Sequence, residues 1–209
     1  MKHVVAAALL GLPLASASAS ILYTNQQRSI TATASADFGS TVVTQSLSAP
    51  DFGPFNEGLE VLAISTTGQH SGLGRADQES TLEPLRIFAS GGWSGLRSGG
   101  PGGWGGGTSW FSVTFLLEEP SDFTFRVGLV PGGPFMFSGP DGFLIDQEGF
   151  HSGTLHPGTY SLTAQASGGA SFPASGGGFS LELLLVPAPA SVGAVAPLIA
   201  LTAARRRRA

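Results

Sequence analysis

The sequence predicts an all-β protein with one antiparallel β-sandwich or jelly-roll-like domain. Three observations lead to this prediction: short segments in which apolar and polar residues alternate, turn-forming residues between these segments, and few signs of helix. The chain of 209 residues contains no cysteine, so the core alone must hold the domain together. The domain is expected over residues 20–185, which is long enough for one sizeable core.

The first half of this domain contains the weaker candidate strands. Residues 28–37 place Ile30, Ala32, Ala34 and Ala36 on one face, as the two-residue period of a strand requires. Further candidates are residues 41–47, 58–66 and 82–89. Pro84 in the last segment cannot donate a backbone hydrogen bond, so we expect it at a strand edge or bulge.

The second half of the domain contains four segments with clearer alternation. Such a pattern places one face of a strand on the core and the other in water. The segments are residues 109–118, 122–130, 158–167 and 178–186. Their predicted core residues are Phe111, Val113, Phe115 and Leu117; Phe123, Phe125, Val127 and Leu129; Tyr160, Leu162, Ala164 and Ala166; Phe179, Leu181, Leu183 and Leu185.

A glycine-rich stretch separates the two halves. Residues 91–107 contain ten glycines, a composition too rich in glycine for a regular strand or helix. The sequence therefore predicts a long mobile loop here.

Trp93, Trp104 and Trp110 lie in or beside the glycine-rich stretch. Aromatic rings stack on apolar patches of sugars, and loops often carry binding residues, so the three are candidate sugar-binding residues. The alternative is that the rings fold back and cover the open end of the sandwich. We favour the alternative, because ordering so glycine-rich a loop around a ligand would cost backbone entropy.

The charge of the domain differs from that of the whole chain. The chain has 14 acidic and 10 basic residues, a net charge of −4. Lys2 and residues 205–208 account for five of the basic residues, which leaves five arginines and a net charge of −9 (5 − 14) between the end segments. A domain so acidic lacks the basic surface of a nucleic-acid-binding protein and should repel anionic membrane surfaces.

Residues 1–19 have the organisation of a secretory signal peptide. A basic start precedes an apolar run over residues 4–14 and then a series of alternating alanines and serines. The small residues suit signal peptidase and predict cleavage after Ala17 or Ala19. A buried helix at the edge of the domain is the alternative, but Pro13 fits it poorly. The sequence therefore predicts export.

Residues 186–209 combine a Pro-rich start, a short apolar stretch and a basic end. A helix over residues 191–204 would span only ~21 Å, which is short for a hydrocarbon core of ~30 Å. The stretch therefore suits transient membrane insertion better than a permanent anchor. The basic end, Arg205, Arg206, Arg207 and Arg208, would hold the C-terminus in the cytoplasm and leave the domain outside.

This C-terminal segment resembles the PEP-CTERM sorting signal of Gram-negative bacteria. The motif residues are Val186, Pro187, Ala188 and Pro189, and Ala188 stands where the family has glutamate. The resemblance covers 24 residues and implies recognition by an exosortase-like membrane protease. It also implies a tethered inner-membrane intermediate, and then a place at the cell surface or in an exopolysaccharide or biofilm matrix.

Few other residues suggest chemistry. His151 and His156 could form a zinc pair, but we expect solvated turn histidines. Asp141, Asp146 and Glu148 could offer oxygen ligands to calcium, although their spacing is not that of an EF-hand loop. We expect no catalytic residue, no metal site and no cofactor.

Three functions follow from these observations. The first is a non-catalytic envelope or matrix protein, sorted through its tail after signal peptidase has acted. The alternative is a carbohydrate-binding module that uses the tryptophans. The third is an extracellular hydrolase, which would need a facing carboxylate pair such as Asp141 or Asp146 with Glu83. The spacing of these acids in the sequence does not support such a pair.

Overall fold

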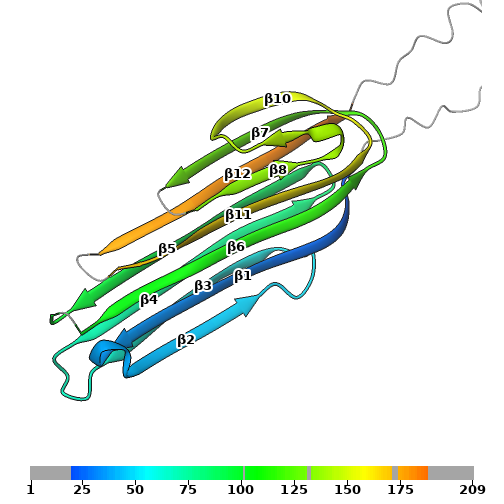
Figure 1. The fold of residues 1–209 in the computed structure, drawn as a ribbon. Coiled ribbons are helices and arrows are strands. Elements are labelled where there is room, and N and C mark those ends of the chain that lie inside the picture. The colour runs from blue at the N-terminus through cyan, green and yellow to red at the C-terminus, as the bar shows by residue number, and fades with distance from the viewer. Residues whose placement is uncertain (1–19, 101, 131–132, 171–173, 188–209) are drawn as a thin grey trace, which may run out of the picture. The chain divides into compact units, whose positions relative to one another are not determined.

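The computed structural model describes residues 20–100, 102–130, 133–170 and 174–187. The predicted signal peptide and the tail beyond Pro187 lie outside these residues. The described part is all-β, with two antiparallel sheets that face each other (Figure 1). The predicted β-sandwich is therefore confirmed. Within the described residues, no helix has the length and apolar character needed to cross a bilayer.

Sheet A contains six strands in the order β2-β1-β6-β11-β8-β9. They are β1 (Leu22–Ala36), β2 (Thr41–Ser48), β6 (Trp104–Leu117), β8 (Phe135–Ser138), β9 (Leu144–Ile145) and β11 (Gly158–Ala170). Two short 3₁₀ helices, η1 (Asp37–Gly39) and η2 (Pro140–Gly142), follow β1 and β8.

Sheet B contains the other six strands in the order β10-β7-β12-β5-β4-β3. They are β3 (Phe55–Ile64), β4 (Ser71–Glu83), β5 (Arg86–Ser98), β7 (Ser121–Val130), β10 (Gly149–Leu155) and β12 (Ser175–Pro187). Consecutive strands β3, β4 and β5 pair as a meander, whereas β5, β6, β7 and β8 alternate between the sheets. The core is therefore built from both sheets all along the chain.

The segment 82–89, predicted as one strand, is instead divided between the end of β4, a two-residue turn and the start of β5. Glu83 pairs with Arg86, so Pro84 and Leu85 form the connection. Proline suits this place because a turn residue does not need its N–H for the ladder. Most of β4 was not predicted, because its glycines and charged residues hide the alternation that its burial pattern shows.

The glycine-rich stretch 91–107 is also not the mobile loop that we predicted. β5 continues to Ser98 and β6 begins at Trp104, so only residues 99–103 connect them. The reason is a close approach of the sheets. A Cβ atom on Gly105 would lie 1.9 Å from the carbonyl oxygen of Leu73 in the opposite sheet. Glycine is needed here because any side chain would collide with backbone.

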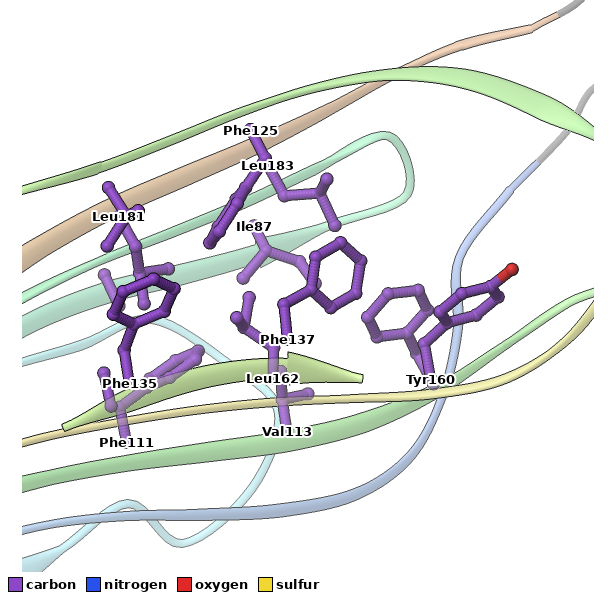
Figure 2. Packing of buried hydrophobic residues seen from close by; sticks show 14 of the residues in the cluster. Ile87, Phe111, Val113, Phe125, Phe135, Phe137, Tyr160, Leu162, Leu181 and Leu183 are labelled. Carbon is purple, nitrogen blue, oxygen red and sulfur yellow. The ribbon is translucent and has the colours of Figure 1, made fainter. Parts of the chain in front are cut away.

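Large side chains fill the other half of the sandwich. Figure 2 shows Phe125 and Leu183 of sheet B pointing toward Phe137 and Leu162 of sheet A. The Phe125 and Phe137 ring centroids are 5.3 Å apart, a normal distance for a packed aromatic pair. The predicted inward faces of β6, β11 and β12 are buried as expected, and so are Phe123, Phe125 and Val127 of β7.

Arg28 is buried within the core, with 1% of its surface exposed. Its guanidinium donates to the carbonyl oxygens of Asp51 and Gly53 and to the Ser80 hydroxyl. Burial lowers the pKa of this group. These bonds fix the connection from β2 to β3, where the chain crosses from sheet A to sheet B.

Candidate functional site

The predicted sorting motif begins inside the last strand. Val186 and Pro187 end β12, where they pair with Asp122 and Ser121 of β7. The Val186 side chain is 55% exposed. Ala188, Pro189, the basic residues 205–208 and the predicted cleavage residues Ala17 and Ala19 lie outside the described residues.

Both ends of the described sandwich meet at one turn. The Ile21 N–H donates to the carbonyl oxygen of Pro84 at 2.7 Å, and the Leu185 N–H donates to that of Leu85 at 2.8 Å. Pro84 and Leu85 are the two residues that connect β4 and β5. The described chain therefore enters and leaves the sandwich at the same place, beside Pro84 and Leu85.

The three tryptophans do not form one platform. Trp93 points into the sandwich and is only 9% exposed. Trp104 and Trp110 lie on the outer face of sheet A, six residues apart on β6, which corresponds to ~20 Å along a strand. Trp104 is the more exposed of this pair, at 36%, and its ring lies against Gly169 of β11. Of the predicted sugar-binding residues, Trp104 is the most exposed.

The outer face of sheet A carries no charge. The six strands of this sheet contain one charged residue, Arg28, and it points inward. The outer face carries serine and threonine hydroxyls, together with the exposed side chains of Val42, Trp104 and Met136. Neighbouring strands link the hydroxyls directly: the Thr31 and Ser46 hydroxyls are 2.9 Å apart, and those of Thr33 and Thr44 are 3.2 Å apart.

The outer face of sheet B has the opposite character. Arg75 pairs with Glu60 at 2.7 Å, and Arg86 pairs with Glu182 at 2.8 Å. Arg86 also lies over the ring of Phe88. The acidic character of the domain therefore comes from sheet B and the connecting segments, and it leaves one large neutral face on sheet A.

A shallow pocket of about 270 Å³ lies beside η2. Its polar lining includes Asp141, Thr154, His156 and Tyr160. The Tyr160 hydroxyl donates to the carbonyl oxygen of His156 at 2.8 Å, and burial raises the pKa of Tyr160. Neither Asp146 nor Glu83 lines this pocket, so the carboxylate pair that a hydrolase would need is not assembled there.

The described residues contain no group of three histidine, aspartate or glutamate side chains placed to hold a metal ion. Asp141, Asp146 and Glu148 are among the described residues and belong to no such group. The His151 ring packs against Phe125, and its Nε2 atom lies 2.8 Å from the carbonyl oxygen of Gln147. His156 lines the pocket instead.

Comparisons with family models, curated proteins and solved structures find no match to this chain. The uncharged outer face of sheet A was not among the sites predicted from the sequence. A signal was present, because the segments that form this sheet alternate apolar residues with serine and threonine but almost never with charged residues.

Proposed function

We propose that this chain is an exported, non-catalytic protein of the cell envelope or extracellular matrix. In this proposal residues 1–19 direct export and are removed by signal peptidase. The segment from Val186 onward inserts briefly into the inner membrane and is processed by an exosortase-like enzyme. The sandwich then remains at the surface or in the matrix of a Gram-negative bacterium.

The position of the core relative to the two proposed cuts carries this proposal. Cleavage after Ala19 would fall just before Ile21, the first buried core residue of the described chain. A cut after Pro189 would fall just beyond β12, whose last buried residue is Leu185. Both end segments could therefore be removed without loss of a described core residue. The common exit point beside Pro84 and Leu85 would also let one region of membrane hold both ends during export.

The test is to compare the intact masses of the protein from membrane and medium fractions. The full chain would be expressed in a Gram-negative host that encodes an exosortase, with an epitope inserted after Gly68 in the exposed β3–β4 turn. We expect signal peptidase to remove residues 1–19 and the exosortase to remove everything beyond about Pro189. Deletion of the exosortase, or alanine at Pro187 and Pro189, should keep the tail on the protein. An uncut tail in the unmodified host would contradict the sorting proposal.

The neutral outer face of sheet A favours a second candidate function, the binding of an uncharged polysaccharide. Hydroxyl groups at hydrogen-bonding distance from one another and one exposed indole suit a polymer that is itself rich in hydroxyls. The Trp104→Ala variant should then lose retention on an insoluble neutral polysaccharide. Phe88→Ala is the matched control, because Phe88 is an aromatic residue on the outer face of sheet B. Equal retention of both variants and the parent protein would exclude this role for Trp104.

A further inference from the structure

The free edge of sheet A at β2 lacks the features that usually prevent strands from pairing between molecules. Such features include charged side chains, proline, short length and glycine interruptions. β2 spans eight residues, TVVTQSLS, and has none of them. No described strand pairs with its outer side.

The other three sheet edges are protected. β3 carries Glu57 and Glu60, β9 has only two residues, and β10 has glycine at positions 149 and 153. The contrast matters because the described domain carries a net negative charge, which opposes contact between two copies over most surfaces. Contact is least opposed at the uncharged β2 edge.

The backbone groups that β2 presents outward can be identified. The Ala49 N–H donates to the carbonyl oxygen of Arg28 at 2.8 Å, so these two residues form a hydrogen-bonded pair. Hydrogen-bonded and non-hydrogen-bonded pairs alternate along antiparallel strands. The register Ser29↔Ser48 then directs four N–H and C=O pairs away from β1. They belong to Val42, Thr44, Ser46 and Ser48.

The close hydroxyl contacts agree with this assignment. Side chains approach most closely in non-hydrogen-bonded pairs. Thr31 with Ser46 and Thr33 with Thr44 are two such pairs, and their hydroxyls are in contact. The outward backbone groups of β2 are therefore free to bond another strand.

We propose that β2 pairs antiparallel with β2 of a second copy of this chain, around a two-fold axis at Gln45. In this register Val42 pairs with Ser48 of the other copy, and Thr44 with Ser46. All four outward-directed residues of each strand are then hydrogen-bonded, since every such pair exchanges two bonds. The two copies of sheet A become one continuous sheet.

The side chains are also self-complementary in this register. Val43 faces Leu47 of the other copy, and both are apolar residues on the inner face of the sheet. Leu47 is 39% exposed in one copy, so the pairing would cover it. Gln45 faces itself across the axis, where its amide can both donate and accept. Because no position opposes a charge to a charge, a second copy fits this edge better than an unrelated acidic or basic strand.

Cysteine at the axis tests the register directly, since the chain has no cysteine of its own. Facing residues of a non-hydrogen-bonded pair have Cα atoms about 4.5 Å apart, within the range that a disulfide spans. Gln45→Cys should therefore cross-link most of the protein, isolated from cells that express the full chain, into covalent dimers under mild oxidation. Thr44→Cys is the matched control and should stay largely uncross-linked, because Thr44 faces Ser46 and not itself.

The mass of the protein in solution gives the second readout. We expect twice the chain mass for the parent protein and a single chain mass for Thr44→Pro. The Thr44 N–H points away from β1, so proline should disturb only the free edge. If Thr44→Pro does not fold by circular dichroism, Thr44→Lys serves in its place. A monomeric parent with no Gln45→Cys cross-link overturns the proposal. A dimer that persists in both the Thr44→Pro and the Thr44→Lys variants also overturns it.

Discussion

The space between the two sheets is filled by large side chains in one half of the sandwich, here called the aromatic half. In the other half, here called the glycine half, glycines of β4, β5 and β6 let the sheets approach closely. In the aromatic half, Phe125 and Phe137 meet between the sheets, and Figure 2 shows further rings and branched side chains around them. In the glycine half, the backbones themselves approach: a Cβ atom on Gly74 would lie 2.1 Å from the Thr33 carbonyl oxygen. Side-chain size thus sets the separation of the sheets along their length. Glycine on the facing sides of β4, β5 and β6 therefore marks tight packing.

The comparison also explains where the tryptophans lie. A Cβ atom on Gly168 would be 2.3 Å from the Trp93 ring, and one on Gly169 would be 2.2 Å from the Trp104 ring. The same β-strand, β11, thus makes room for one indole inside the sandwich and for one outside. The glycine half holds Trp104 on the neutral outer face of sheet A, whereas both ends of the described chain lie beside Pro84 and Leu85.

The largest predicted effect comes from removing a side chain in the aromatic half. Phe125→Ala should lower the free energy of unfolding by ~3–5 kcal/mol, because it leaves a cavity among rings that cannot fully collapse. Urea-induced unfolding followed by circular dichroism measures this change. A loss below ~1 kcal/mol would mean that the aromatic half is loosely packed.

In the glycine half, adding a side chain should lower the free energy of unfolding. Gly105→Ala is expected to cost ~1–3 kcal/mol or more, because its methyl group would meet the Leu73 backbone. Gly58→Ala in β3 is the control, since nothing lies within 4 Å of its Cβ position. That variant should be neutral or stabilised by a few tenths up to ~1 kcal/mol. Equal unfolding midpoints for both variants would refute the close approach of the sheets.

A smaller effect on the free energy of unfolding is expected at alkaline pH, where Tyr23 ionises. The Tyr23 hydroxyl donates to the Glu83 carbonyl oxygen at 2.6 Å, and burial together with the nearby Glu83 charge raises its pKa. An unfolded tyrosine ionises near pH ~10. The folded state holds this proton more tightly, so its stabilising contribution is complete below that pH and is lost as the pH rises further.

Tyr23→Phe tests this contribution. The variant should lose ~1 kcal/mol at neutral pH through the missing hydrogen bond. Its free energy of unfolding should then fall less steeply above pH ~10 than that of the parent. Part of the decline in the free energy of unfolding at alkaline pH should remain in the variant, because the pKa of Tyr160 is also raised. Parallel curves of unfolding free energy against pH for the two proteins would show that Tyr23 does not contribute to the decline above pH ~10.

The sequence predicted the aromatic half well and the glycine half poorly, for a physical reason. Burial of Phe111, Val113 and Phe115 follows from alternation alone, because large apolar residues must leave water wherever they lie. Glycine carries no such preference. Its place in β5 and β6 depends on how closely the opposite sheet approaches, which no local pattern records.

The same limit applies to the candidate sites. The proposed cleavage residues Ala17 and Ala19 and the proposed motif around Pro187 are predicted from the sequence alone, because processing enzymes read short linear segments. The neutral face and the β2 edge depend on which strands become neighbours. Hairpin pairing of β1 and β2 follows from the sequence order, but the position of β6 beside β1 joins residues at least 69 positions apart, as in Ser35 and Trp104.

Residues 91–98 and 104–110 are paired strands inside a closely packed sandwich. Amide hydrogen exchange on the native protein, followed by mass spectrometry, tests this pairing. We expect these amides to exchange as slowly as those of residues 111–117, because both sets belong to interior strands. Exchange within seconds across 91–107 would contradict it. That result would restore a mobile loop and make Trp93 available to a ligand.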